Sequence, residues 1–319
     1  TLVSFIDWRA IFWVNIPVGL IAILLTLRYI PESKAPRPRR FDPVGQALVL
    51  VMLASVTYGI IEGPNLGWTS PVILSAFIAS ALSLAGLIVY EPRRGEPLID
   101  LRFFKSIPFS SSIVILIAAF AAFGGFLFLS TLYLQEVRDL SPVHAGLVTV
   151  PMALMLVAFS PISGRMVGRR GPRLPLLISG VCSIVACVML TGLDEGTSYA
   201  WLIAAYVVFG IGMGFVNAPV TNAAVSGMPR AQAGVASAIA TTSRQFGQTI
   251  GVAVIGAIVA SGAGATVSAE LTSASVPAWW TLAAFGAAVL VFGLVATSRR
   301  AERSAHRTAT ALNPEALAE

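Results

Sequence analysis

Nine long apolar stretches, separated by short polar segments, constrain the fold of this chain more than any other feature. They run approximately through residues 10–30, 44–62, 71–90, 109–135, 143–164, 174–193, 199–221, 237–262 and 279–297. About 20 apolar residues in a helix cross the ~30 Å hydrocarbon core of a bilayer. Backbone polar groups find no water there, so each stretch must satisfy them within a helix. The sequence therefore predicts an all-α integral membrane protein with nine transmembrane helices.

The balance of charged residues agrees with membrane insertion and predicts an orientation. Only 11% of the residues are charged, against about 25% in soluble domains. If the amino end is outside, 19 of the 21 Lys and Arg fall on inner segments, and only Arg9 and Arg138 do not. The positive-inside rule then predicts a multi-pass protein of the plasma or inner cell membrane with a cytoplasmic carboxyl end. We assign the net charge of +6 to contacts with membrane lipids and expect no nucleic-acid partner.

The tryptophans and the two ends of the chain lead to three further expectations. All six tryptophans lie at or near predicted outer helix ends, as in an interfacial belt. Thr1 is not an initiator and no leader peptide precedes the first apolar stretch, so we expect sequence to be missing upstream. The tail after Arg307 is polar, and we expect it to be disordered.

The region from Phe209 to Ile258 places glycines and polar side chains inside two apolar stretches. Gly210 and Gly214, like Gly247 and Gly251, are four residues apart and so share a helix face. Small residues on such a face let helix backbones approach closely in lipid. Polar side chains at this depth are costly unless they face the bundle interior or a water-filled path. Helix packing and the lining of a polar route are both open for Asn217, Asn222, Arg244, Gln245 and Gln248.

Arg244 and Glu62 are candidate intramembrane charges. A span of about 20 residues ending at Ser261 leaves Arg244 just inside the boundary, where its side chain would snorkel to the headgroups. The uncharged stretch upstream instead allows a longer helix that carries Arg244 deeper, and we favour this interpretation. Glu62 is the one acid near membrane depth. Either it is a proton site or it lies at the outer interface beside Gly63, and the second arrangement is more common.

Residue patterns typical of an enzyme or a cofactor site do not occur in the sequence. His144 falls in a predicted outer loop and His306 in the tail. There is no pair of intramembrane carboxylates, no HExxH and no phosphate-binding GxxxxGK[ST]. Cys182 and Cys187 are five residues apart on different helix faces, which disfavours a disulfide or a metal pair. We expect no enzymatic activity, no cofactor and no metal centre.

Seven segments, in order, resemble the fourteen-span drug:proton antiporter branch of the major facilitator superfamily. They are WRAIFWVNIPVGL, FDPVGQAL, EGPNLGWTSP, PLIDLRFF, YLQEVRDLSPVHAGLVTVP, SGRMVGRRGPR and AGVASAIATTSRQFGQTIGVAVIGA. By this resemblance the chain corresponds to spans six to fourteen. The implied divisions are the last helix of the amino-terminal bundle (1–30), a cytoplasmic linker (31–43), a central two-helix hairpin (44–90), a cytoplasmic connector (91–108), a carboxyl-terminal six-helix bundle (109–297) and a cytoplasmic tail (298–319).

The resemblance implies part of a secondary active transporter. Such a protein exports drug-like or antibiotic-like amphipathic compounds in exchange for protons, and exposes its cavity alternately to the two sides of the membrane. The implied partners are a small amphipathic substrate, protons and the missing amino-terminal bundle, where the family's proton-coupling residues are usually assigned. The cavity candidates are Tyr133, Gln135, Asn217, Asn222, Gln245 and Gln248.

One loop departs from the family pattern. SGRMVGRRGPR resembles the family's Gly-x-x-x-Asp-Arg-x-Gly-Arg loop, but Gly168 stands at the acidic position. A charge relay through that acid is therefore not carried over. The loop motif, expected to form a tight turn with a conformational role, comprises Gly164, Arg165, Arg169, Arg170 and Gly171.

Two alternatives from other functional classes remain open at the level of sequence. The first is a non-transporting membrane scaffold or sensor, or a dimerising half-transporter, if the chain is complete as given. The second is an intramembrane enzyme acting on lipid, which would need catalytic polar residues clustered near one interface. The resemblance places the transporter ahead of both.

Overall fold

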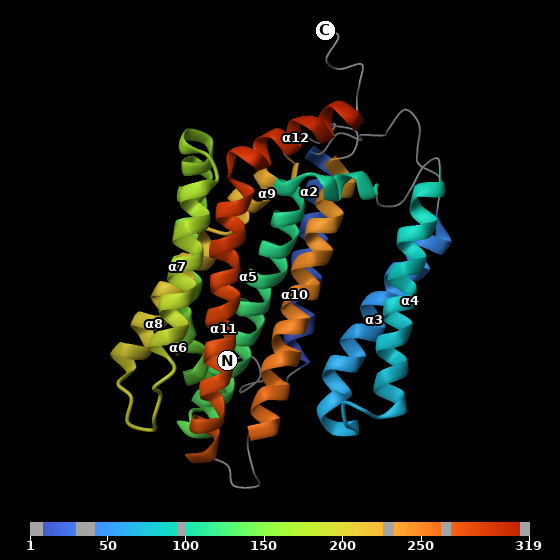
Figure 1. Ribbon diagram of the computed structural model, residues 1–319. Helices are drawn as coiled ribbons and strands as arrows, with labels where there is room; N and C mark the ends of the chain where they lie inside the picture. Colours follow the sequence, from blue (N-terminus) through green and yellow to red (C-terminus); the bar gives the residue numbers. More distant parts are fainter. Residues whose placement is uncertain (1–8, 30–41, 95–99, 226–232, 263–268, 313–319) are drawn as a thin grey trace.

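The computed structural model describes residues 9–29, 42–94, 100–225, 233–262 and 269–312. All regular elements in these ranges are helical, and most of them run side by side along one direction (Figure 1). The main helices are α2 (Ala10–Tyr29), α3 (Pro43–Leu66), α4 (Pro71–Tyr90), α5 (Ile107–Leu132), α6 (Pro142–Arg170), α7 (Arg173–Met189), α8 (Tyr199–Gly214), α9 (Asn217–Val225), α10 (Ala233–Gly262), α11 (Ala269–Ala296) and α12 (Arg299–Leu312). Three single turns, η1 (Glu91–Arg93), η2 (Leu101–Lys105) and η3 (Tyr133–Val137), complete the regular structure.

The predicted all-α membrane architecture is confirmed in its coarse form. In the described part of the chain, 7 helical segments are long and apolar enough to cross a membrane. Helix α7, which has only 17 residues, and helix α10 lie outside this group. The number of nine spans therefore stays a prediction.

Several helices begin at capping residues that the sequence supplies directly. Asp42 accepts a hydrogen bond from the Gly45 N–H at 3.0 Å at the start of α3. Ser70, Ser141 and Ser198 cap α4, α6 and α8 in the same way. A side-chain oxygen at this position satisfies one of the free N–H groups of the first turn. A proline follows in the first turn of α3, α4 and α6, where its missing N–H costs nothing.

Helices α5 and α10 meet backbone to backbone through their glycines. A Cβ atom added to Gly247 would lie 2.5 Å from the Ile117 carbonyl oxygen, and one added to Gly251 would strike the backbone of Ala121. From the other side, a Cβ atom on Gly124 would lie 2.6 Å from the carbonyl oxygen of Gln248. Such approach gives lipid-embedded helices their van der Waals contact.

The contact between α6 and α8 is built in the same way. A Cβ atom on Gly210 would strike the backbone of Met152, and one on Gly214 would lie 2.9 Å from Cβ of Phe159. The two glycine pairs singled out in the sequence thus lie where neighbouring helices come closest.

An aromatic cluster fills the centre of the bundle formed by α5–α11. The ring of Phe126 stacks on Phe209 with 3.9 Å between centroids, and Tyr206 and Trp279 meet its edge. Trp279 is only 1% exposed, so its predicted place in an interfacial belt is wrong. Trp279 and Trp280 are neighbours and point in directions about 100° apart on a helix, so only Trp280 faces outward. Trp8 lies outside the described residues, and the remaining tryptophans, Trp13, Trp68, Trp201 and Trp280, are exposed.

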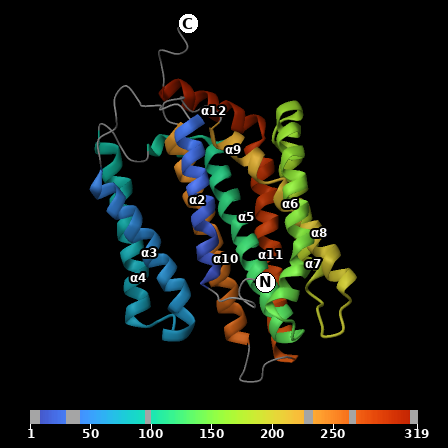
Figure 2. The same cartoon turned by 180° about the vertical axis from the view of Figure 1, so that it is seen from behind.

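Helices α3 and α4 form a hairpin that stands beside α10 (Figures 1 and 2). A Cβ atom on Gly59 would lie 2.8 Å from the ring of Phe77, so α3 approaches a side chain here and not a backbone. The Ser80 hydroxyl donates to the Met52 carbonyl oxygen at 2.9 Å and links the two helices. Helix α2 is almost wholly exposed along its described length.

Helix α12 lies across one end of the bundle and not along the long helices (Figure 1). Its residues Ala301, Ala305 and Thr308 are buried, and the Ser304 hydroxyl accepts a hydrogen bond from the Ile107 N–H at 3.0 Å. The predicted disorder after Arg307 is therefore wrong for residues 308–312, while residues 313–319 lie outside the described part. Small residues at intervals of three and four make one face of this helix able to pack, although the segment is polar overall.

Candidate functional site

The polar candidates fall around a break in one predicted span. The stretch 199–221 is not one helix, because α8 ends at Gly214 and α9 begins at Asn217. The Phe215 N–H bonds back to the Ile211 and Gly212 carbonyl oxygens, and its own carbonyl oxygen accepts from the Ser163 hydroxyl at 3.3 Å. A buried partner of this kind is what irregular backbone at membrane depth requires.

Arg244 lies beside this break. Helix α10 begins at Ala233, as the deeper interpretation of Arg244 requires, and a rise of 1.5 Å per residue places Arg244 about 16 Å from the helix start. Its Nη1 donates to Oδ1 of Asn217 at 3.3 Å, and its Cζ lies 5.8 Å from the ring centroid of Phe120 on α5. Its Nε is buried and has no hydrogen-bond partner among the described residues.

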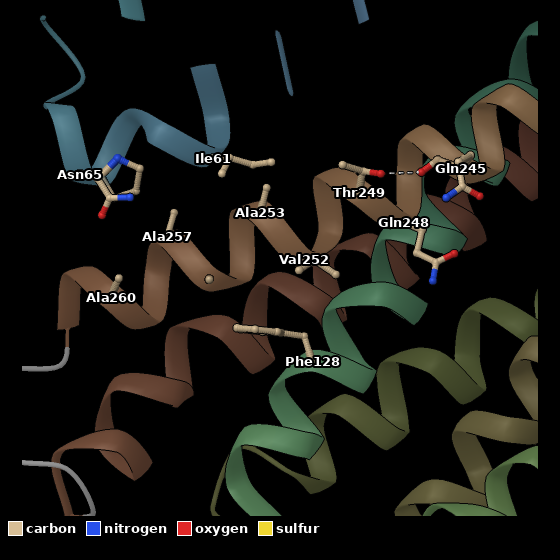
Figure 3. Close-up of a pocket in the computed structure, with 12 residues that line it drawn as sticks. Ile61, Asn65, Phe128, Gln245, Gln248, Thr249, Val252, Ala253, Ala257 and Ala260 are labelled. Carbon is tan, nitrogen blue, oxygen red and sulfur yellow. Dashed lines mark hydrogen bonds between the residues drawn. The ribbon is translucent and has the colours of Figure 1, made fainter. Parts of the chain in front are cut away.

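Gln245 and Gln248 line a hollow of about 560 Å³ between α3 and α10 (Figure 3). Apolar side chains of both helices form most of its wall, and Asn65 and Thr249 add polar groups. In Figure 3 the end of α3, with Ile61 and Asn65, faces the row of small side chains on α10. A second hollow of about 480 Å³ continues between the same helices and is lined by Thr57, Tyr58, Thr242, Gln245 and Thr249, among others.

Tyr133 and Gln135 do not join this group. Tyr133 lies thirteen residues beyond Phe120 on the same helical path, about 20 Å away. It is buried, and its hydroxyl donates to the Asp194 carbonyl oxygen at 2.6 Å. Arg138 donates to the Tyr133 hydroxyl at 3.2 Å and to the Thr197 carbonyl oxygen at 2.6 Å. The structure therefore places Tyr133 in a group of hydrogen bonds that connects η3 to the loop before α8.

Aromatic rings surround the guanidinium of Arg138 at the same place. Its guanidinium lies 4.6 Å above the ring of Tyr199. The hydrogen bond to Tyr133 raises the pKa of Arg138 above its ordinary value. Gln135 is half-buried in the adjoining turn.

Asn222 and Glu62 also lie apart from Arg244. The side chain of Asn222 is exposed on α9. Glu62 is half-buried near the end of α3 and accepts a hydrogen bond from Nδ2 of Asn65 at 3.4 Å. A position four residues before the helix end fits the interface interpretation better than a deep proton site.

The loop motif is mostly helix. Helix α6 continues to Arg170, so the tight turn expected for the whole segment is confined to Gly171 and Pro172. Gly171 has φ +79°, a conformation that favours glycine, and its N–H bonds to the Val167 carbonyl oxygen. Gly164 and Gly168 face open space. The three arginines of the motif, Arg165, Arg169 and Arg170, are exposed.

Two polar features escaped the sequence analysis. Thr242 and Thr249 lie three residues before and four residues after the predicted candidate Gln245 on α10, and this spacing on one helix face was visible in the sequence. At the start of α3, buried Asp42 also accepts from the Tyr90 hydroxyl at 3.2 Å, and Arg94 lies 3.8 Å away. Because Asp42 and Tyr90 are 48 residues apart, their contact had no local signal.

Comparison with known proteins identifies the family. A family model described as Major Facilitator Superfamily matches residues 1–252. The chain belongs to this superfamily. It is therefore a multi-pass membrane protein of a family of transporters, which fits the expectation that it is not an enzyme.

Several curated relatives carry names that refer to drug or antibiotic export. The chain is 35% identical over 267 residues to the multidrug resistance protein Stp of Mycobacterium tuberculosis (84% of this chain, 50% of the relative). It is 31% identical over 277 residues to the tetracenomycin C resistance and export protein of Streptomyces glaucescens (86% and 52%). It is 31% identical over 266 residues to the methylenomycin A resistance protein of Streptomyces coelicolor (82% and 54%). The chain spans about half the length of these relatives.

Proposed function

We propose that the chain forms the carboxyl-terminal part of a fourteen-span, proton-coupled exporter of drug-like or antibiotic-like amphipathic compounds. Upstream sequence supplies the amino-terminal bundle, including the proton-coupling residues, and the α12 end faces the cytoplasm. The names of the relatives support export as the activity. They do not favour a scaffold or sensor.

The observation that carries this proposal is the polar face of α10 beside a broken helix. Gln245, Gln248 and Thr249 border mostly apolar hollows, and this combination suits amphipathic ligands of varied shape. Transporters commonly place substrate near interrupted helices, and the interruption at Phe215 lies next to Asn217. Glycine contacts between α5 and α10 let these helices slide without large side chains in the way.

The test is efflux by the complete protein in bacteria lacking their major efflux systems. The probes are three fluorescent dyes of different charge: ethidium, pyrenebutanol and pyrenebutyrate. We expect faster efflux of at least one dye than in cells with the empty vector, and loss of that efflux when nigericin collapses the pH gradient. Efflux that ignores the gradient would contradict proton coupling, and no efflux of any dye would contradict the export proposal.

A matched pair of variants tests whether the polar face of α10 lines the substrate path. Gln248→Ala removes a polar group that lines the hollow beside α10. Thr131→Ala removes an exposed hydroxyl that bonds only to the Leu127 carbonyl oxygen of its own helix. We expect the first to change the order of preference among the dyes and the second to leave it intact. An unchanged profile in Gln248→Ala would remove this face of α10 from the path.

A further inference from the structure

Arg244 carries a positive charge inside the long helix α10, and no acid in the described part of the chain forms an ion pair with it. The printed sequence places it eleven residues inside α10, and its side chain is half-buried. The ion pairs found among the described residues join Arg94 to Asp42 and Arg102 to Asp100. A charged group inside a membrane is costly, and such groups usually find a partner or mark a substrate path.

Among the described residues, the contacts that hold the guanidinium come from neutral groups. Asn217 accepts one hydrogen bond from Nη1, and the ring of Phe120 lies beneath the guanidinium at 5.8 Å. Both contacts orient the group, since a cation above an aromatic face is attracted to it. Neither contact supplies a negative charge. Nε is buried and unpartnered among the described residues, so part of the planar fork of donors remains to be satisfied.

Arg244 does not itself line the hollow between α3 and α10, but it lies one helical turn along α10 from residues that do. Gln248 follows Arg244 by one turn on the same face of α10 and lines the hollow, and Gln245 lines it as well. A ligand whose charged group contacts Arg244 can therefore extend its apolar part along α10. The planar guanidinium fork matches a carboxylate, which it can bind with two parallel hydrogen bonds.

We propose that Arg244, oriented by Asn217 and Phe120, binds the anionic group of the transported compound. The ligand class is an amphipathic organic acid, with a carboxylate or a similar oxyanion at one end of an apolar body. This inference rests on the proposed export function and adds a substrate class to it.

Binding of two matched dyes to the complete protein tests the proposal. Pyrenebutyrate and pyrenebutanol share an apolar body and differ in the charged group. The protein is placed in lipid nanodiscs of uncharged phosphatidylcholine, and binding is followed by pyrene fluorescence. The variants are Arg244→Gln, Arg244→Lys and Asn217→Ala, with Arg300→Gln as the control because Arg300 is an exposed arginine on α12. Thermal unfolding of each variant checks that the fold is retained.

We expect the Arg244 variants to lose affinity for pyrenebutyrate and to keep their affinity for pyrenebutanol. Removing a charge-assisted hydrogen bond raises Kd by about tenfold or more. We therefore expect Arg244→Gln to raise the Kd of pyrenebutyrate by that factor and to change the Kd of pyrenebutanol by less than about twofold. Arg244→Lys should retain part of the affinity, because it keeps the charge and loses the fork. Asn217→Ala should weaken the acid by a smaller factor, and Arg300→Gln should change neither dye.

Three outcomes would overturn the proposal. Equal binding of pyrenebutyrate by wild type and Arg244→Gln would show that Arg244 does not bind the acid. An equal loss of affinity for both dyes in Arg244→Gln would show that Arg244 stabilises the packing of the helices and does not bind the acid. In a third outcome, phosphatidylglycerol in the disc displaces pyrenebutyrate from the wild type but does not change the weak pyrenebutyrate binding of Arg244→Gln. That result would show that the anion bound at Arg244 is a lipid phosphate. Binding needs no transport, so failure of efflux would refute export without touching this result.

Discussion

The bundle α5–α11 and the hairpin α3–α4 are built from equally apolar helices but pack in different ways. In α5 of the bundle, 61% of the most apolar window is buried, against 11% in α3 and 17% in α4, although α6 of the bundle is also buried to only 11%. Helices of the bundle meet through backbone atoms at Gly247, Gly251 and Gly210, whereas α3 and α4 meet through flexible side chains such as Phe77. Apolar character in a membrane protein therefore does not measure packing, because lipid covers an apolar face as well as a neighbouring helix does.

Truncating a core phenylalanine should show the largest difference between the two regions. Phe126→Ala empties space between Phe209, Tyr206 and Trp279, and we expect it to lower the free energy of unfolding by about 3–5 kcal/mol. Phe77→Ala in the hairpin removes a half-buried ring and should cost about 1–2 kcal/mol. Thermal unfolding in detergent measures both. Equal losses would refute the contrast between the bundle and the hairpin.

Substituting a contact glycine sharpens the comparison at the level of the backbone. Gly247→Ala forces a methyl group against the Ile117 carbonyl oxygen, so we expect a loss of about 1–3 kcal/mol in the free energy of unfolding. Gly234→Ala is the control on the same helix, because nothing lies within 4 Å of its Cβ position and alanine favours helix by up to about 1 kcal/mol. If Gly247→Ala is as stable as Gly234→Ala, helices α5 and α10 can move apart enough to accommodate a methyl group at little cost in free energy.

The smallest expected effect concerns the attachment of α12 to the bundle. Ser304→Ala leaves the Ile107 N–H without its partner and should cost about 0.5–1.5 kcal/mol. Thr310→Ala is the control, because that exposed hydroxyl bonds only to the His306 carbonyl oxygen within α12. Amide hydrogen exchange at the start of α5 measures the difference. Identical exchange in the two variants would mean that α12 does not stabilise α5.

Local sequence predicted the features that depend on neighbours along the chain. Helices were predicted correctly over each apolar stretch, apart from the break at Phe215, because the backbone has no other way to satisfy its polar groups in lipid. The spacing of Gly247 and Gly251 identified the face of α10 that meets α5, because four residues return to the same side of a helix. The uncharged stretch before Arg244 allowed the early start of α10.

Contacts between distant residues had no such signal. Tyr133 was expected at a cavity and instead bonds to the loop at Asp194, sixty-one residues away. Trp279 was expected at the interface and is buried against Phe126, because hydropathy cannot tell which of two adjacent tryptophans faces inward. The polar tail was expected to be disordered, yet three small side chains allow α12 to pack.

The sequence by itself determined which segments enter the membrane as helices, because the composition and length of each segment set the free energy of its insertion into the bilayer. Only the tertiary structure decided which faces meet and where a polar group finds a partner. The pairing of Arg244 with Asn217, across 27 residues and beside a broken helix, is the clearest case. All apolar faces are equivalent to lipid, so the choice among them depends on shape and on hydrogen bonds that form only once the helices have assembled.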